Sequence, residues 1–183
     1  MRKQELGTDR SMEIITNRLR ITELTMEMAE DIHADSLDDA TRRFLPDEVF
    51  ETVEEARETV TFLMSRYDAL EGPLVYAVIR KEDGGLVGYV QMVPVEEGIY
   101  EIGYHIGERY RGNGYAEEAV RAFLPVMSQT LGISEVYGIS LKENVPSSKV
   151  LANCGFETVF EGIGCYQGNQ REIVKSIWTA NCC

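Results

Sequence analysis

The sequence predicts a single domain of the α/β class, which some schemes would call α+β. Its 183 residues are 44% hydrophobic and include no low-complexity stretch, so the chain can bury a substantial core. Segments with strand-like and helix-like patterns alternate along the chain. A glycine-containing loop, RGNGYA at residues 111–116, joins one such strand to one such helix.

The N-terminal region predicts a leader followed by a strand and a helix. Residues 1–12 are expected to form a flexible leader, and residues 13–183 the domain itself. The segment IITNRLRIT, residues 14–22, has the pattern of a first strand. A helix is expected to follow over residues 25–37, with Thr25 as its N-cap.

A second helix and a hairpin come next. Thr52 is expected to form a capping box with Glu55. LVYAVIR and LVGYVQMV flank KEDGG, so residues 83–85 are expected to turn between two strands. The buried face of the second helix is predicted to carry Ala56, Val60, Leu63, Met64 and Tyr67.

The central segment predicts a strand, the glycine loop and a long helix. IYEIGYHI, residues 99–106, is rich in Ile and Tyr as strands are. Pro125 lies inside the helix and is expected to kink it. Apolar residues follow the loop at helical spacing, at Ala116, Ala119, Val120, Phe123, Leu124, Met127 and Leu131.

The C-terminal region predicts a strand, a short helix and two last strands. EVYGISL, residues 135–141, has a strand pattern. Asn144 is a plausible N-cap for the short helix, Pro146 lies in its first turn, and Gly155 follows its end. FETVFEG and REIVKSIWT supply two strands around a glycine-containing turn.

The RGNGYA loop can be a simple turn or a phosphate site, and its position favours the second. The first N–H groups of a helix have no intrahelical partner, and the helix dipole favours an anion there. Gly112 and Gly114 can take left-handed backbone angles and let a bulky anion approach. Glu117 stands where the dinucleotide fingerprint needs glycine, and no P-loop or kinase signature is present.

The loop fits R-x-x-G-x-A through Arg111, Gly114 and Ala116, and so resembles the acyl-CoA pyrophosphate signature of the GNAT N-acetyltransferases. The order of the predicted elements is similar to that fold over nearly the whole chain. NRLRI, EIGYHIGERYRGNGYAEEA, NVPS and CGFE resemble the ribosomal-protein N-terminal (alanine/serine) acetyltransferase branch. The resemblance implies a mixed, mostly antiparallel sheet of about seven strands flanked by about four helices.

The resemblance also implies a cofactor site. Strand 99–106 would splay from strand 135–141, and the thioester of acetyl-CoA would lie between them, with a backbone N–H placed for the oxyanion. Asn144 could bond the pantetheine amide, although a helix-cap role is an equal alternative. The residues expected at the cofactor are Tyr104, His105, Ile106, Arg111, Gly112, Asn113, Gly114, Tyr115, Ala116, Glu117 and Asn144.

Two residues are expected to carry the proton transfers. The attacking amine must be neutral, and Glu101, on the key strand, is the first candidate for its base, with a solvated strand carboxylate as the alternative. His105 alternates onto the same side, where a structural role is more common. Many family members use a tyrosine at the position of Leu151 as the donor to the leaving thiolate. The resemblance to the ribosomal-protein branch implies Ser147 for this role, and the alternative is an ordinary capping-region residue.

Charge and cysteine content restrict the partners. The 18 basic and 31 acidic residues give a net charge of -13, which argues against nucleic acid and is compatible with a cationic substrate or with solubility alone. No 18-residue apolar run or signal-peptide core is present, which indicates a cytoplasmic protein with no membrane partner. No metal is expected, and reduced thiols are predicted at Cys154, Cys165, Cys182 and Cys183.

The resulting hypothesis is an acetyl-CoA-dependent transfer to a primary amine, on either a protein N-terminus or a small molecule. The alternatives are a non-catalytic acyl-CoA-binding sensor and a nucleotide-binding or interaction domain that shares only the glycine turn. Residues 39–50, DATRRFLPDEVF, carry no motif that names the acceptor. The oligomeric state is also open, a homodimer included.

Overall fold

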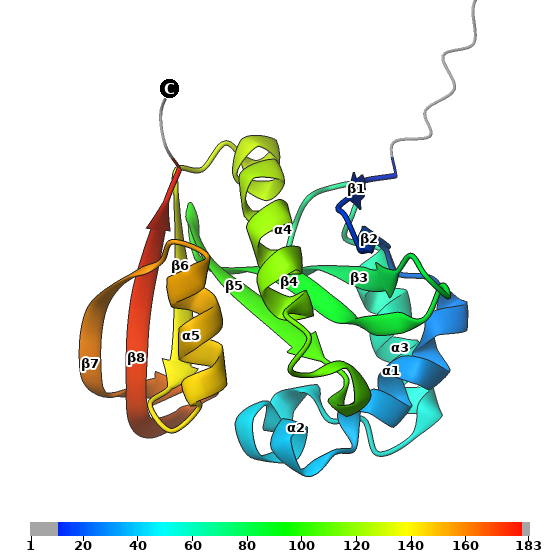
Figure 1. The fold of residues 1–183 in the computed structure, drawn as a ribbon, viewed down its shortest axis with the longest axis horizontal. Helices are drawn as coiled ribbons and strands as arrows, with labels where there is room; N and C mark the ends of the chain where they lie inside the picture. The colour runs from blue at the N-terminus through cyan, green and yellow to red at the C-terminus, as the bar shows by residue number, and fades with distance from the viewer. Residues whose placement is uncertain (1–10, 181–183) are drawn as a thin grey trace, which may run out of the picture.

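A computed structural model describes residues 11–180 (Figure 1). The leader predicted for residues 1–12 lies outside the described residues up to position 10, and the first strand begins at Glu13. The helices, in chain order, are α1 (Ala29–Ser36), α2 (Asp39–Phe44), α3 (Val53–Met64), α4 (Tyr115–Leu131) and α5 (Val145–Asn153), with 3-10 turns η1 (Met26–Met28), η2 (Pro46–Glu48) and η3 (Glu108–Tyr110).

The described residues form one eight-stranded sheet in the order β1-β2-β3-β4-β5-β6-β8-β7. Every neighbouring pair is antiparallel except β5 and β6, which are parallel. The predicted mixed, mostly antiparallel sheet is therefore confirmed. The strands are β1 (Glu13–Ile15), β2 (Leu19–Glu23), β3 (Leu74–Arg80), β4 (Leu86–Glu96), β5 (Ile99–Ile106), β6 (Glu135–Leu141), β7 (Glu157–Tyr166) and β8 (Asn169–Thr179).

Two apolar layers cover the two faces of the sheet. On one face, Phe123 of α4 packs in a buried cluster with residues of β3, β4 and β5. On the other, Ile32 of α1 and Val60 of α3 pack against alternate residues of β3 and β4. Figure 1 shows α4 crossing the front of the sheet and α5 in front of β6 and β8. Because the strands are covered on both sides, β3 reads as a continuous apolar run.

The strand predicted over residues 14–22 is wrong as a single element. The chain turns back after Ile15, and β1 pairs with β2 in an antiparallel hairpin. Thr16 closes the turn, because its N–H donates to Leu19 O at 2.9 Å and its hydroxyl accepts from Leu19 N–H at 2.9 Å. The polar side chain of Thr16 thus ends β1 inside the segment that was predicted as one strand. The sheet therefore has eight strands where about seven were expected.

The segment between the first strands and α3 also differs from the expectation. Thr25 makes no side-chain cap bond, and the helix predicted from it starts as the turn η1 before α1. Residues 39–44, which carried no recognised motif, form α2, capped by Asp38 through bonds from Ala40 N–H and Thr41 N–H. This unpredicted element brings the α-helices among the described residues to five, where about four were expected.

Most of the other local signals are confirmed. The buried face predicted for the second helix is wrong at two positions, because Met64 is 38% exposed and Tyr67 lies beyond the last residue of α3. Thr52 and Glu55 form the reciprocal capping box of α3. Asn144 caps α5, and Gly155 follows it with a φ of 89°. The strands predicted at residues 99–106 and 135–141 have those bounds. α4 continues as one helix through Pro125, whose missing N–H leaves the carbonyl of Arg121 without its helical donor.

Candidate active site

The site is built on the separation of two neighbouring strands. β5 and β6 share a single register pair, Glu101 with Tyr137, and their remaining residues do not pair. A cavity of about 860 Å³ opens between them. Its walls come from α2, η2, the middle of β4, β5, one residue of β6, the first turn of α4, the length of α5, and the end of β7. The splayed strands expected from the sequence are present.

The RGNGYA loop forms one end of this cavity. Gly112 and Gly114 both have a φ of 76°, a conformation that side chains with a Cβ rarely adopt. The first N–H of α4 to be bonded is that of Glu118, which donates to Gly114 O at 3.1 Å. Within residues 11–180, the amides of residues 112–117 donate to no protein group. Such a row of free amides at a helix N-terminus suits a phosphate.

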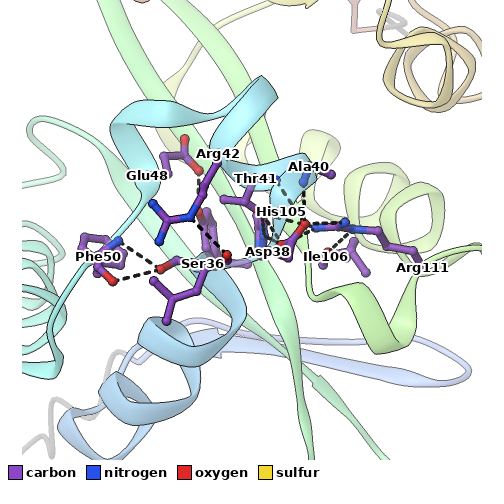
Figure 2. A network of polar contacts seen from close by, with 12 residues as sticks. Ser36, Asp38, Ala40, Thr41, Arg42, Glu48, Phe50, His105, Ile106 and Arg111 are labelled. Carbon is purple, nitrogen blue, oxygen red and sulfur yellow. Dashed lines mark hydrogen bonds and ion pairs between the residues drawn. The ribbon is translucent and has the colours of Figure 1, made fainter.

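Arg111 does not point its charge at this row of amides. Its guanidinium binds both carboxylate oxygens of Asp38 at 2.8 Å, and its Nε donates to Ile106 O at 2.9 Å (Figure 2). Burial alone would raise the pKa of Asp38, but hydrogen bonds from Arg111 and Thr41 outweigh burial and hold that pKa well below its usual range. The side chain therefore ties the loop to the start of α2.

A second ion pair holds the loop from the opposite side. Arg18, in the β1–β2 turn, donates from Nε to Glu118 at 2.6 Å and from Nη1 to Asn113 O at 2.9 Å. Its guanidinium also lies 4.6 Å from the centre of the Tyr115 ring. The NRLRI segment thus supports the first turn of α4 from outside the cavity.

His105 is part of the support and not a free base. Its Nε2 lies 2.8 Å from the hydroxyl of Thr41 (Figure 2). Its ring stacks on that of Tyr89, with the ring centres 5.2 Å apart. Burial, and then the nearby Arg111 charge, lowers the pKa of His105 to about 4. The imidazole is therefore neutral near pH 7, and both His105 and Glu101 lie on the same face of β5, as expected.

Glu101 lines the cavity beside the point where β5 leaves β6. Burial raises the pKa of Glu101 to about 7, and the distant charge of Lys175 opposes this only in part. Within the described part of the chain, its carboxylate has no hydrogen-bond donor or ion-pair partner. A carboxylate with these properties can take a proton at neutral pH.

Tyr104 and Ser147 meet across the cavity. The two hydroxyl oxygens are 2.9 Å apart, and the tyrosine hydroxyl also lies 3.1 Å from Ser147 O. Asn144 accepts from Ser147 N–H at 3.3 Å as a helix cap, while its amide nitrogen donates a hydrogen bond to no protein group among residues 11–180. Leu151, at the position where a tyrosine is usual, is 3% exposed and packs against Gly138.

The other side of the cavity contains a polar group that the sequence did not indicate. Glu48 of η2 accepts hydrogen bonds from the hydroxyl of Tyr89 and, at 2.9 Å, from Nε2 of Gln91. Burial raises the pKa of Glu48 despite these two donors. Tyr166, at the end of β7, donates to Phe44 O at 2.8 Å and closes this side of the wall.

The structure brings nearly all of the predicted site residues to one cavity. Asn113 is the exception, since it does not line the cavity, and its side chain donates to Tyr110 O and Arg111 O instead. The predicted residues that line the cavity are Glu101, Tyr104, His105, Ile106, Arg111, Gly112, Gly114, Tyr115, Ala116, Glu117, Asn144 and Ser147.

The residues missed from the sequence are Asp38, Glu48, Gln91 and Tyr166. One of them carried a usable signal, because Asp38 precedes a polar helical segment as N-caps do. The contacts of the other three depend on elements far apart in the sequence. No local pattern marks such side chains.

Two further features of the described residues bear on chemistry. No group of three or more His, Cys, Asp or Glu side chains within residues 11–180 could hold a metal ion. Cys154 is buried and Cys165 is exposed, both as free thiols, while Cys182 and Cys183 lie outside the described residues. Among the helices described, none is long and apolar enough to cross a membrane.

Comparisons with known proteins agree with this geometry. The acetyltransferase (GNAT) domain family matches residues 18–157. The chain is 26% identical over 147 residues to an uncharacterized N-acetyltransferase, p20, of Bacillus licheniformis, covering 79% of this chain and 82% of that protein.

Solved structures share the fold. A GNAT-family acetyltransferase from Bacillus anthracis superposes with a TM-score of 0.80 at 24% identity, covering 92% of this chain and 98% of that one. The ribosomal-protein acetyltransferase RimL, solved in complex with coenzyme A, superposes with a TM-score of 0.79 at 16% identity, again over 92% and 98% of the two chains. At these identities the likeness describes the arrangement of the elements.

Proposed function

The chain belongs to the GNAT acetyltransferase family, whose members are acetyl-CoA-dependent acyltransferases, and from this membership we propose that it moves the acetyl group of acetyl-CoA directly to a primary amine. The acceptor in this proposal is a protein N-terminus or a small-molecule amine. The observation that carries the proposal is the course of β5, which leaves β6 after one register pair and leads directly to the loop of free amides.

The groups that are free to bind acetyl-CoA support one course for the cofactor through the cavity. The pyrophosphate would accept from the amides of residues 112–117, which have no protein acceptor within the described chain. The pantetheine would follow the unpaired edge of β5 at Tyr104 and His105, where a backbone N–H would stabilise the oxyanion. The free amide nitrogen of Asn144 can donate to a pantetheine carbonyl.

The proposed reaction transfers the acetyl group directly to the amine, without a covalent enzyme intermediate. The neutral amine attacks the thioester carbon and forms a tetrahedral intermediate, whose collapse breaks the carbon–sulfur bond and leaves an amide and a thiolate. Glu101 would receive the proton that the amine loses, directly or through water, because its pKa of about 7 suits that transfer. Ser147 would donate a hydrogen bond to the departing sulfur.

The test is a thiol-release assay with acetyl-CoA and a panel of acceptors: alkylamines, diamines, amino acids, aminoglycosides and N-terminal peptides. We expect release of coenzyme A that depends on the acceptor, with an acetylated amine identified by mass spectrometry. Acetyl-CoA binding without release for any acceptor would instead indicate an acyl-CoA sensor. Absence of acetyl-CoA binding would contradict the site itself.

A further inference from the structure

Two carboxylates face the cavity without a cation to balance either of them. Glu48 and Glu101 both line it, and neither forms an ion pair within residues 11–180. Lys175 acts on Glu101 only at a distance, because its Nζ lies 4.2 Å from the centre of the Tyr137 ring. Buried carboxylates are normally paired, so these two lack the ion-pair partner that is usual for such groups.

The carboxylate of Glu48 is fixed in place but not neutralised. Tyr89 donates to one of its oxygens and Gln91 to the other, and both donors are uncharged. A carboxylate offers about four lone-pair sites, so about two remain for a ligand. Two neutral donors thus hold Glu48 in one orientation at the cavity wall.

The sheet register sets the spacing between the two carboxylates. Gln91 pairs with Gly103 across β4 and β5, and its Nε2 lies 2.5 Å from where a Cβ on Gly103 would be. Glu48, bonded to that amide, therefore lies near Gly103. Glu101 is two residues earlier on the same strand face, about 7 Å away along β5.

The nearby arginines cannot serve as counter-ions, because each already has an acidic partner. Arg42 pairs with Glu51 at 2.5 Å, and Arg43 pairs with Glu143 at 2.5 Å. Arg111 is bound to Asp38. Lys149 of α5 also lines the cavity, but its side chain is exposed and forms no ion pair with Glu48 or Glu101. A ligand ammonium group would therefore supply the direct ion-pair partner that both carboxylates lack.

We propose that the acceptor is a small diamine, whose reacting amine lies at Glu101 while its second ammonium group binds Glu48. This inference rests on the proposed acetyl transfer and names the acceptor class for the same cavity. The two nitrogen atoms of a diamine would then give each carboxylate a positively charged partner and a hydrogen-bond donor. The side chain of Gln91 lies over Gly103, which has no side chain of its own, and its amide holds Glu48 at the cavity wall.

The test measures binding of two matched probes to the protein saturated with coenzyme A, so that no turnover occurs. Isothermal titration compares 1,4-diaminobutane with 1-aminobutane, which has the same carbon chain and one ammonium group fewer. We expect the diamine to bind at least about tenfold more tightly. Glu48→Gln should remove that preference while leaving 1-aminobutane binding unchanged, and Asp47→Asn, which deletes a neighbouring acid that does not line the cavity, should keep it.

Three results would overturn the inference. The two probes would bind equally to the unmodified protein, the preference for the diamine would survive Glu48→Gln, or Asp47→Asn would lose that preference as fully as Glu48→Gln does. The first comparison needs no variant, so it decides the matter even if Glu48→Gln does not fold. Thiol release reports separately on the proposed function. If coenzyme A is released with monoamines and the two probes bind equally, only the proposal of a diamine acceptor is rejected. If the diamine binds preferentially but no acceptor gives release of coenzyme A, only the proposed acetyl transfer is rejected.

Discussion

The hydroxyl oxygens of Tyr104 and Ser147 lie 2.9 Å apart, so a side chain of β5 contacts the first turn of α5 across the cavity. The tyrosine has one proton to donate, and two acceptors, the hydroxyl and the carbonyl of Ser147, lie within reach. Only when Tyr104 donates to the serine hydroxyl is the serine proton free for the leaving sulfur. Tyr104 is thereby a positioning residue for Ser147, in a chain where Leu151 offers no hydroxyl.

Tyr104→Phe should therefore lower kcat while leaving acetyl-CoA affinity nearly unchanged. General acid assistance is typically worth about 10²–10⁴ in rate, and we expect a loss of about tenfold to a hundredfold because the serine remains. Ser147→Ala should give a similar loss, and the two changes together should cost less than the product of their separate effects. Tyr100→Phe, on the same strand but outside the cavity lining, is the control. Independent effects in the double variant would contradict the coupling.

Gly114→Val should prevent acetyl-CoA binding, because a branched Cβ is placed at a φ of 76° in the loop that would hold the pyrophosphate. The left-handed conformation alone costs about 1–2 kcal/mol for a residue with a Cβ. Gly84→Val is the matched control, since Gly84 has a φ of 71° in the β3–β4 turn and does not line the cavity. Titration with acetyl-CoA should show loss of binding in Gly114→Val and unchanged binding in Gly84→Val. Equal affinity in a folded Gly114→Val protein would reject the pyrophosphate site.

Glu101→Gln should lower kcat by about 10²–10⁴ and remove the rising limb of the pH–rate profile near pH 7, where the pKa of Glu101 lies. The Glu101 carboxyl should also affect the stability of the fold. Its pKa is higher in the folded state, so the folded protein binds more protons than the unfolded chain between about pH 4.5 and 7. The free energy of unfolding should therefore fall as the pH rises through that range. Thermal unfolding at pH 5 and pH 8 should show a relative gain for Glu101→Gln at pH 8. If Glu101→Gln keeps the pH–rate profile of the unmodified enzyme, a group other than Glu101 is the general base.

Local patterns predicted the elements that carry the cofactor site, and distant contacts account for what they missed. The period-two pattern of β5 and the glycines of the loop depend on neighbouring residues, and both are found where the sequence placed them. The Arg111–Asp38 pair joins residues 73 positions apart, and the Gln91–Glu48 bond joins residues 43 apart. Such pairs are determined by how the elements pack. The guanidinium of Arg111 was expected at the cofactor, but it binds Asp38, the N-cap of α2, because packing brings the two together.

Asp38→Asn should destabilise the fold and loosen the loop together. The substitution leaves Arg111 with a neutral partner, and breaking a buried ion pair costs roughly 3–5 kcal/mol, less here because Arg111 is 33% exposed. We expect a fall in the free energy of unfolding of about 2–3 kcal/mol and weaker acetyl-CoA binding. Urea denaturation checks the first and titration the second. Asp39→Asn, on the exposed side of the same helix, should change neither, and equal effects of the two variants would reject the role of the pair.

Direct transfer to the amine predicts that neither described cysteine is needed for turnover. Burial raises the pKa of Cys154 to about 11, so its thiol is a poor nucleophile at neutral pH. Cys165 is exposed and lines the cavity, which makes it the more demanding test. The double variant Cys154→Ala, Cys165→Ala should keep kcat within about twofold to threefold of the unmodified enzyme. A covalent acetyl-cysteine, trapped by acid quenching and seen by mass spectrometry on Cys165, would replace direct transfer with a two-step mechanism.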